Sequence, residues 1–381
     1  MRITPSTSNK DRRVLLLVDA DSEVYPRGIG EEDDDEITAL SNLRQHRMSI
    51  LLMILGSALI FSGFLVVVYS FMSPGLSTAT DEFEDFVERF NKAYDSAEEV
   101  LLAKKNFLLN RLSLLESRLQ YPDVIFDLHE DMDVAPEELR KTFGLLAGGD
   151  SPFIGEGSTR WMGFPERLDR PESHSWKDKG TPVKDQKSCG SCWAFATVAS
   201  VEYIHAIAGN PIVSLSEQEL VDCETRSNGC HGGVRSYALA FVMHKGLVRE
   251  ASYPYTAKDG GQCRVGNETR VFIPDYRLLS RNEEDIADWV YKTGPVTFGM
   301  KVTPSMYNYR SGIFHPSRED CETKSEGSHA LVIVGYGTEG GKPYWLVKNS
   351  WGSSWGDGGY FKLARGVDAC GMADSAAAPM R

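Results

Sequence analysis

The chain has 381 residues, of which 41% are hydrophobic and 25% charged, and its net charge is −13 at pH 7. This length is too great for one ordinary domain and sufficient for a large two-lobed core. The acidic balance argues against nucleic-acid binding as the main task, because no basic domain offers itself to phosphates.

The N-terminal residues 1–47 are polar and charged and include an acidic run at residues 31–36. We expect a disordered, cytosolic tail here. Asp11 followed by Leu15 and Leu16 fits a loose acidic dileucine sorting pattern. A short apolar patch in a disordered tail is the alternative interpretation.

Residues 48–72 form an apolar run without a charged side chain. As a helix it would rise about 37 Å, enough to cross a hydrocarbon core of about 30 Å. A signal peptide is the competing interpretation, but its apolar region is shorter and lies nearer the N-terminus. Arg44 and Arg47 precede the run and acidic residues follow it. The sequence therefore predicts a transmembrane signal anchor, with the C-terminal bulk in a lumen.

Residues 81–145 are predicted to be helical. Phe83, Phe86 and Phe90 recur at helix-face spacing, and residues 100–119 are rich in Leu and Lys without Gly or Pro. A glycine-containing linker is predicted over residues 146–169. From about Arg170 the composition changes to Gly, Cys, Trp and Tyr, which indicates a separate domain over residues 170–381.

Seven cysteines lie between Cys189 and Cys370, and none lies before them. Six could pair, and the one left over would join a partner chain or be reactive. Paired cysteines indicate an oxidising compartment, in agreement with the luminal orientation. The alternative is seven reduced cysteines in a cytosolic protein.

Cys192 lies where a glycine-containing turn leads into an Ala-rich segment, residues 193–208, with apolar residues at helical spacing. At the first turn of a helix, unpaired N–H groups and the helix dipole favour an anion, so we expect the pKa of this thiol to fall. A thiolate attacks a carbonyl carbon. Cys189 and Cys192 also have the spacing of half a zinc site, but no second pair completes it, so we expect no metal and no cofactor.

His329 begins an apolar run, residues 327–337, that is predicted to be a buried strand. A second strand is predicted over residues 344–352, after a short turn around Gly340 and Gly341. The two strands should form a hairpin that brings His329 near Asn349. Asn349 could then bond one imidazole nitrogen and leave the other facing Cys192.

Three sequence blocks carry a family resemblance: Cys-Gly-Ser-Cys-Trp-Ala-Phe from Cys189, Ser-His-Ala from Ser328, and Lys-Asn-Ser-Trp-Gly from Lys348. Residues 215–223 and 230–233 add two more. Together they resemble the papain family, most closely its cathepsin L-like branch, over roughly residues 81–381. The resemblance implies an α+β fold with a helical left lobe and a β-barrel-like right lobe, preceded by a helical inhibitory prodomain over residues 81–145.

The resemblance also implies the catalytic roles. Cys192 and His329 would form a thiolate–imidazolium pair oriented by Asn349, and Trp351 would shield the His–Asn bond from water. Gln186 would donate to the oxyanion together with the backbone N–H of Cys192. The implied disulfides, which leave Cys192 free, are Cys189–Cys230, Cys223–Cys263 and Cys321–Cys370.

Substrate-binding residues are implied along the cleft: Gly232, Gly233, Val234, Gly299, Ser328, Trp351 and Ser375. The pocket for the side chain two positions before the scissile bond should be lined by Val234, Arg235, Gly299, Gly327 and Ser375. Small residues there suggest a roomy, apolar pocket for Leu, Phe or Val, which Arg235 or Asp374 could modify. His231 is interpreted as a neighbour of the cleft and not a catalyst, and Asn267 begins a glycosylation sequon.

We therefore expect a cysteine endopeptidase made as a single-pass, membrane-anchored zymogen, with its catalytic domain in a lysosome- or vacuole-like lumen. This layout resembles membrane-tethered cathepsin L-like enzymes of parasitic protists. Its partners would be protein or peptide substrates, its own prodomain as an intramolecular inhibitor, and the membrane through residues 48–72. Low pH should weaken the prodomain's hold by protonating acidic residues: Glu130, Asp131, Asp133, Glu137 and Glu138.

Two alternatives remain open. One is an exopeptidase of the same family, against which no long insertion is seen near residues 230–240. The other is a catalytically silent, membrane-anchored binding homologue.

Overall fold

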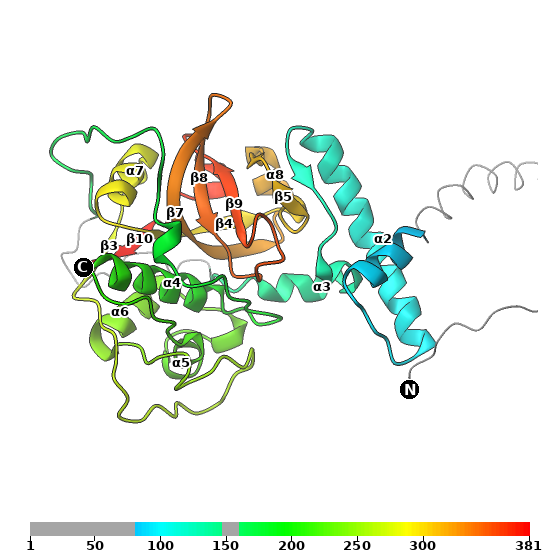
Figure 1. The fold of residues 1–381 in the computed structure, drawn as a ribbon, viewed down its shortest axis with the longest axis horizontal. Helices are drawn as coiled ribbons and strands as arrows, with labels where there is room; N and C mark the ends of the chain where they lie inside the picture. The colour runs from blue at the N-terminus through cyan, green and yellow to red at the C-terminus, as the bar shows by residue number, and fades with distance from the viewer. Residues whose placement is uncertain (1–80, 147–159) are drawn as a thin grey trace, which may run out of the picture. The chain divides into compact units, whose positions relative to one another are not determined.

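The computed structural model describes residues 81–146 and 160–381 (Figure 1). The predicted tail, the apolar run 48–72 and residues 147–159 of the predicted linker lie outside these ranges. Among the described residues, no helix combines the length and apolar character needed to cross a membrane.

The first part of the described chain contains two helices, one over residues 81–89 and the longer α2 (Ala97–Gln120). Ser96 caps α2, because its Oγ accepts a hydrogen bond from the backbone N–H of Glu99 at 3.2 Å. The inner face of α2 buries Phe107, whose ring lies 5.4 Å from Phe83 and 5.1 Å from Phe86. The phenylalanines that recur at helix-face spacing in the sequence thus pack the first helix against α2.

The prediction of helix up to residue 145 is wrong beyond Gln120. The chain there forms β1 (Ile125–Phe126), η1 (Glu130–Asp133), α3 (Pro136–Leu139) and η2 (Arg140–Thr142). Pro122 and Pro136 lack the backbone N–H that a continuing helix needs. Strand β1 pairs antiparallel with β5 (Tyr309–Ser311), which attaches this segment to the later part of the chain.

Three helices share one apolar core: α4 (Cys192–Ile207), α5 (Glu217–Cys223) and α6 (Arg235–Lys245). This core includes Trp193, Val198, Leu220 and Leu239. The other helices and 3-10 turns within the described residues are α7 (Glu283–Lys292), α8 (Arg318–Thr323), η3 (Lys177–Lys179), η4 (Gly229–His231), η5 (Pro304–Met306) and η6 (Ala369–Gly371).

The described strands form a sheet in the order β3-β10-β4-β7-β8-β9-β6, with β2 paired to β7. Their bounds are β2 (His174–Ser175), β3 (Tyr276–Leu278), β4 (Val296–Val302), β6 (Ile313–Phe314), β7 (Gly327–Glu339), β8 (Lys342–Lys348), β9 (Tyr360–Ala364) and β10 (Ala377–Pro379). The predicted hairpin is confirmed: β7 and β8 pair antiparallel around Gly340 and Gly341. Both glycines have positive φ, +58° and +77°, as a tight two-residue turn requires.

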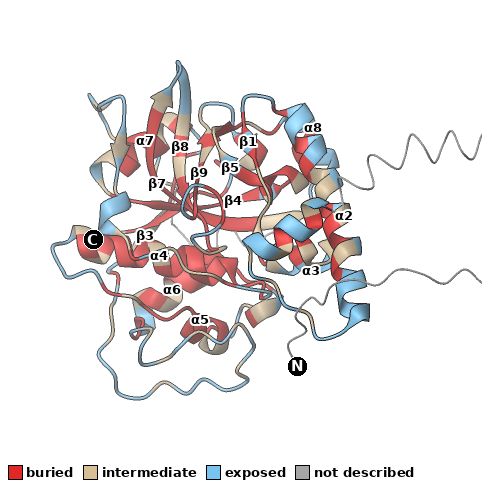
Figure 2. Cartoon of the chain, turned by 45° about the vertical axis from the view of Figure 1, so that its right-hand side comes forward, coloured by how far each residue is buried: buried red, intermediate tan, exposed pale blue. Residues whose placement is uncertain are grey.

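Helix α4 packs against β7, and this seam joins the helical core to the sheet. Cys192, Ala196 and Tyr203 of α4 lie against Ala330, Val332 and Val334 of β7, and the seam is buried in Figure 2. The predicted α+β fold is confirmed. The seam places the start of α4 beside the start of β7, where Cys192 and His329 lie.

Candidate active site

Cys192 is the first residue of α4, as the sequence predicts, and it is fully buried. Gly144, which lies far earlier in the chain, donates its backbone N–H to Sγ of Cys192 at 3.4 Å. The sulfur therefore faces residues that belong to the predicted prodomain.

The predicted fall in the pKa of Cys192 is wrong for this form of the chain. Burial raises its pKa above the ordinary value. The backbone N–H groups of Ala330 and Gly144 and the charge of Arg235 act in the opposite direction but are outweighed. The physical reason is the loss of water from around the sulfur, which disfavours the thiolate.

His329 lies near the start of β7, and Asn349 directly follows β8. The imidazole Nε2 lies 2.8 Å from Oδ1 of Asn349. An amide oxygen only accepts, so Nε2 carries the proton and donates it to Asn349. In the neutral ring the other nitrogen, Nδ1, is then the basic one, and it is buried without a hydrogen-bond partner among the described residues.

Aromatic rings enclose the imidazole of His329. The indole of Trp351 stacks on it with centroids 4.9 Å apart, and Phe143 lies 5.9 Å away on an edge. Burial lowers the pKa of His329 to about 4, although the hydrogen bond to Asn349 acts to raise it. The raised pKa of Cys192 and the lowered pKa of His329 both favour the neutral side chains while residues of the earlier segment cover them.

Gln186 lies beside these residues, also fully buried. Its Nε2 donates to the carbonyl oxygen of Thr142 at 2.7 Å and to that of Cys189 at 2.9 Å. Its Oε1 accepts from Ser350 Oγ at 2.6 Å, which fixes the orientation of the amide. The carbonyl oxygen of Thr142 thus accepts the hydrogen bond that Gln186 is predicted to donate to the oxyanion.

Residues 141–146, hereafter the cleft segment, run between Gly233 and Ser328. Gly233 donates to the carbonyl of Gly144 at 2.8 Å, and Leu146 donates to the carbonyl of Gly233 at 3.2 Å. On the other side Leu145 donates to the carbonyl of Ser328 at 3.2 Å. The cleft segment therefore makes backbone bonds to both walls, as a bound peptide would.

Leu145 fills the pocket predicted for a substrate side chain. A Cβ on Gly299 would lie 2.2 Å from Cδ2 of Leu145, so glycine leaves the room that this leucine uses. Oγ of Ser375 accepts from the backbone N–H of Gly299 at 3.2 Å and from Nη2 of Arg235 at 2.9 Å. The structure brings together Gly299, Ser375 and Arg235 at one end of the pocket.

Of the other residues predicted from the sequence, Gly232 and Gly327 lie against the cleft segment, whereas Asp374 and His231 lie at the surface. A Cβ on Gly232 would lie 2.8 Å from Leu146, and one on Gly327 would lie 3.0 Å from Phe143. Val234 is buried at the start of α6, where its N–H bonds to Ser227 Oγ at 3.2 Å. Asp374 lies 3.5 Å from Nε of Arg281, at the surface. His231 is exposed and pairs with Asp259.

Three disulfides join Cys189–Cys230, Cys223–Cys263 and Cys321–Cys370, with Cα atoms 4.7, 4.8 and 5.1 Å apart. These are the pairs that the resemblance implies. Cys192 is the free cysteine of the described chain. Cys189–Cys230 ties the turn before α4 to the loop that carries Gly232 and Gly233, so it fixes one wall of the cleft relative to Cys192.

The low-pH expectation for Asp131 is wrong in sign. Burial raises the pKa of Asp131, so the docked form favours the protonated carboxyl and is not weakened by protonation. Asp131 lies in a hollow lined in part by Asp185, Lys187 and Trp351.

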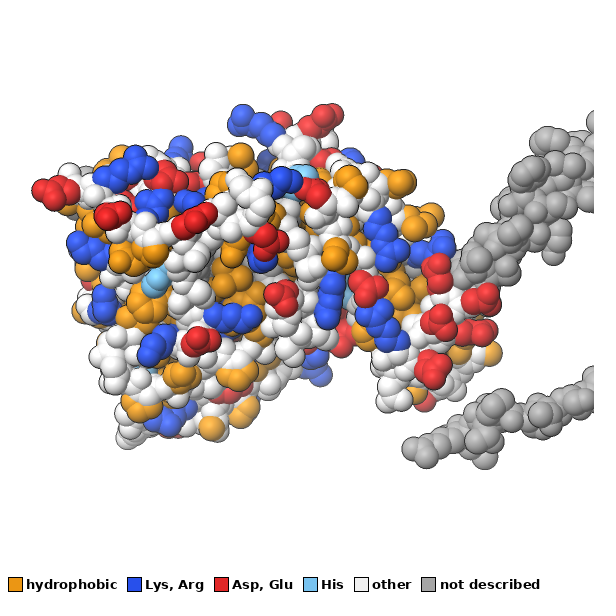
Figure 3. All heavy atoms as spheres, turned by 45° about the horizontal axis from the view of Figure 1, so that its top comes forward, with side chains coloured by type: hydrophobic (Ala, Val, Ile, Leu, Met, Phe, Trp, Pro, Cys, Tyr) orange, Lys and Arg blue, Asp and Glu red, His pale blue; other side chains and the backbone are white. Residues whose placement is uncertain are grey.

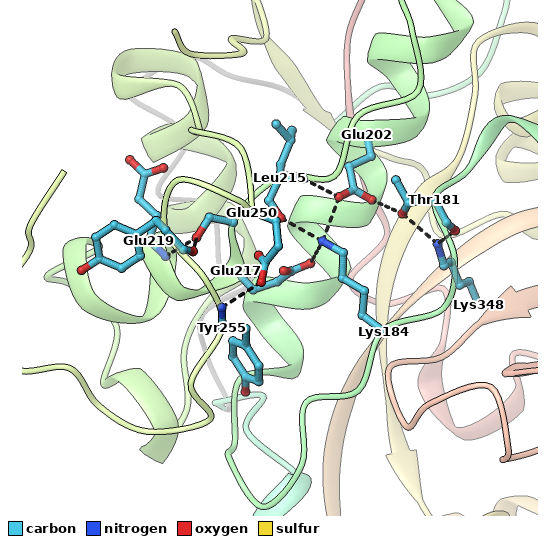
Figure 4. A network of polar contacts seen from close by, with 11 residues as sticks. Thr181, Lys184, Glu202, Leu215, Glu217, Glu219, Glu250, Tyr255 and Lys348 are labelled. Carbon is cyan, nitrogen blue, oxygen red and sulfur yellow. Dashed lines mark hydrogen bonds and ion pairs between the residues drawn. The ribbon is translucent and has the colours of Figure 1, made fainter. Parts of the chain in front are cut away.

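A buried polar network that the sequence did not reveal lies behind the seam (Figure 4). Nζ of Lys184 lies 2.9 Å from Glu202 Oε1, 2.7 Å from Glu217 Oε1 and 2.8 Å from the carbonyl of Leu215. Glu202 also accepts from Thr181, whose carbonyl accepts from Nζ of Lys348 at 2.7 Å. One signal was available: Glu202 is a lone acid in the apolar sequence of α4.

This network links the elements that carry the site. Glu202 belongs to α4, which begins at Cys192, and Lys348 ends β8 directly before Asn349. Burial lowers the pKa of Lys348 to about 8 and raises that of Glu217 to about 8.

The profile described as "Papain family cysteine protease" matches residues 170–380. A viral cathepsin of Cydia pomonella granulosis virus is 33% identical over 321 residues, 82% of this chain and 95% of that protein. Pro-cathepsin H of Mus musculus is 41% identical over 219 residues, 55% of this chain and 65% of that protein.

Solved proforms share the fold. The digestive procathepsin L2 proteinase of Tenebrio molitor larval midgut aligns with a TM-score of 0.70 and 31% identity, covering 80% of this chain and 100% of that one. A recombinant stem bromelain precursor aligns with a TM-score of 0.68 and 28% identity, covering 80% and 99%.

Proposed function

Since the chain belongs to the papain family of cysteine proteases and is a peptide hydrolase, we propose that it is a cathepsin L-like endopeptidase made as a membrane-anchored zymogen. The observation that carries this proposal is the cleft segment, which makes backbone bonds to both walls and contacts Cys192, Gln186 and the pocket at Gly299 at once. Residues 81–145 act as the prodomain, and residues 170–381 as the catalytic domain.

The proposed reaction uses the groups already described. After the cleft segment leaves, the proton of Cys192 moves to Nδ1 of His329, and the thiolate attacks the scissile carbonyl carbon. Gln186 Nε2 and the N–H of Cys192 stabilise the oxyanion. The C–N bond breaks, the amine takes the proton from His329, and a thioester to Cys192 remains. Water, deprotonated by His329, then releases the acid product.

The course of the cleft segment favours an endopeptidase over an exopeptidase. The segment enters beside Thr142 and Phe143, near Trp351, and continues past Leu146 beside Gly233. A chain thus extends on both sides of Cys192, which is what cleavage within a long peptide requires. Product analysis on an N-terminally blocked peptide distinguishes the two: fragments from internal bonds support the proposal, and release of single residues or dipeptides contradicts it.

The sequence supports the proposed location. The uncharged run 48–72, with arginines before it and acids after it, supports a type II anchor that holds the catalytic domain in a lysosome- or vacuole-like lumen. Paired cysteines support an oxidising compartment. Asn267 is exposed and is the proposed glycosylation site. Cleavage between Gly157 and Arg170 would release the enzyme from its anchor.

The proposal is tested by peptide hydrolysis after every chain has been processed by added pepsin, which is then inactivated. Replacing Cys192 or His329 by Ala should lower kcat/KM by about 10⁴-fold or more, because the two act as one unit. Asn349→Ala should cost less, since it orients His329 and does not react. Activity that survives Cys192→Ala would contradict the proposed role, and full inactivity of the processed wild type would favour the silent binding homologue.

A further inference from the structure

Helix α2 exposes an unusual amount of apolar surface. Among the described residues, seven of the thirteen exposed large apolar side chains lie on this one helix: Val100, Leu101, Leu102, Leu109, Leu112, Leu115 and Leu119. Leu112 is 62% exposed and Leu119 is 85% exposed. The opposite face of α2 is already used, because Phe107 and Leu114 are buried against the rest of the molecule. Contiguous exposed apolar surface of this kind marks an interaction site.

The exposed side chains follow a heptad pattern. Positions with alternating spacings of three and four run along the outer face: Leu102, Lys105, Leu109, Leu112, Glu116 and Leu119. All six are exposed. This is the a/d spacing of a coiled-coil seam, which packs against another helix and not against a flat surface. The set, hereafter the leucine stripe, spans about 26 Å at 1.5 Å per residue.

The leucine stripe is complementary to itself in the antiparallel direction. If a second copy of α2 lies antiparallel, centred between Asn110 and Arg111, Leu102 faces Leu119, Leu109 faces Leu112, and Lys105 faces Glu116. The two polar positions then form two equivalent ion pairs across a two-fold axis. Closed two-fold interfaces arise from this kind of self-complementarity. A parallel arrangement would instead put Lys105 against Lys105 and Glu116 against Glu116.

Nearby charges leave this pairing possible. Glu116 forms an ion pair with Nζ of Lys324 at 3.2 Å. Its side chain is still 67% exposed, so its carboxylate is accessible to Lys105 of a second copy. A lipid surface is a poorer match, because membrane-binding helices carry basic residues around their apolar face and the stripe carries an acid within it. We propose that the zymogen associates through α2 as an antiparallel homodimer, seated on the leucine stripe. Removal of the prodomain would then release monomeric enzyme.

Substitutions that reverse the charge at Lys105 or Glu116 test this proposal. Two variants of the full-length chain, Lys105→Glu and Glu116→Lys, are prepared with Cys192→Ala to prevent self-cleavage and reconstituted in vesicles with different tags. Each variant alone puts like charges in contact and should pair at least tenfold more weakly than the parent. Mixed together, they present two Lys–Glu pairs and should recover heterodimers to the parental level. Lys258→Glu is the control, since it makes the same charge change at an exposed position elsewhere.

Cross-linking shows whether the two copies of α2 are antiparallel or parallel. A mixture of Leu102→Cys and Leu119→Cys chains should join through a short bismaleimide, whereas Leu102→Cys alone should not, because its two copies lie about 25 Å apart. Leu112→Gln should weaken the dimer, and Ile212→Gln, at a 52% exposed site elsewhere, should not.

A monomeric parent chain, a stripe protected by lipid in every variant, or homotypic Leu102→Cys cross-links would each overturn the proposal. Pairing that persists after α2 has been removed by processing would also overturn it.

Discussion

Arg235 gives the substrate pocket a character that the small residues around it do not suggest. Its guanidinium is fully buried, and Nη2 donates to the carbonyl oxygen and Oγ of Ser375 at 2.8 and 2.9 Å. A Cβ on Gly299, where Leu145 packs, would lie 3.5 Å from that nitrogen. The pocket therefore has apolar walls and a buried guanidinium group at one end.

We therefore expect the processed enzyme to accept Glu as well as Leu two positions before the scissile bond. Arg235→Met should lower kcat/KM for the Glu peptide by about tenfold or more relative to the Leu peptide, since it removes the charged partner. Paired fluorogenic peptides that differ at this one position measure the ratio. Arg226→Met, at a half-exposed guanidinium that pairs with the buried Glu224, is the matched control. An unchanged ratio would show that Arg235 does not face the substrate.

Glu217 should make the stability of the protein depend on pH. Burial raises its pKa from 4.5 to about 8, although Lys184 acts to lower it. A raised folded pKa stabilises the fold fully below pH 4.5, and this contribution is lost as pH rises through about 8. Glu217→Gln, which mimics the neutral acid, should flatten the decline in Tm between pH 4.5 and 8. An identical slope in the variant would contradict this account.

Some residues of the site belong to a short sequence motif, and others do not. Cys192, His329, Asn349 and Gln186 stand in short blocks with fixed neighbours, so the sequence could nominate all four. Lys184, Glu202 and Lys348 come from distant segments and meet only in the folded chain, so no window of sequence contains them. The pKa of Cys192 depends on burial by a separate segment, and its direction was therefore missed.

Among the elements, the cleft segment depends on one glycine. A Cβ on Gly144 would lie 1.6 Å from the carbonyl oxygen of Gly190, a backbone atom that cannot move aside independently. We expect Gly144→Ala to displace the cleft segment from Cys192. In the intact precursor at pH 7, Cys192 should then react with iodoacetamide at least tenfold faster, as followed by mass spectrometry. Gly266→Ala, at a loop position near a flexible side chain, should leave the rate unchanged.

The cleft segment should also respond to acid through His329. The closed form lowers the pKa of His329 to about 4 from an ordinary value of 6.5. A lowered histidine pKa favours the closed form above pH 6.5, and this contribution is lost as pH falls from 6.5 towards 4. With Cys192→Ala to block self-processing, His329→Asn should delay cleavage of the cleft segment by added pepsin to lower pH. His244→Asn, on α6, serves as the control; equal pH profiles for all three chains would contradict the account.

Helices and strands could be predicted where apolar residues recur over a long run or on both sides of a turn. The prediction was wrong where prolines interrupt the segment. The β7–β8 hairpin followed from two apolar runs around a glycine turn, and α4 from its apolar spacing. Beyond Gln120, acidic and apolar residues resembled a helix, but Pro122 and Pro136 divide the segment into short pieces, of which β1 pairs with β5 and η1 is held by Asn106 and Asn110 of α2. Those contacts join residues far apart in sequence and could not be anticipated locally.

At the scale of the whole molecule, the two-lobed arrangement explains why one segment can silence the site. Cys192 is the first residue of a helix of one core, and His329 lies near the start of a strand of the sheet. Their alignment therefore depends on the α4–β7 seam and on the network behind it. Any chain laid between Gly233 and Ser328 covers both residues together. The family motifs made this architecture predictable from sequence, whereas the residues that cross the cleft had no motif.

Stoichiometric labelling of Cys192 reveals whether this thiol carries the hydrolysis and whether the prodomain covers it in the precursor. The precursor and the acid-processed protein are treated with a peptidyl epoxide, and peptide mapping locates the label while hydrolysis of a peptide substrate is followed in parallel. We expect one label per processed chain, on Cys192, with activity lost in proportion, and almost no label on the intact precursor. Activity that persists when Cys192 is fully labelled, or equal labelling of the precursor, would contradict this expectation.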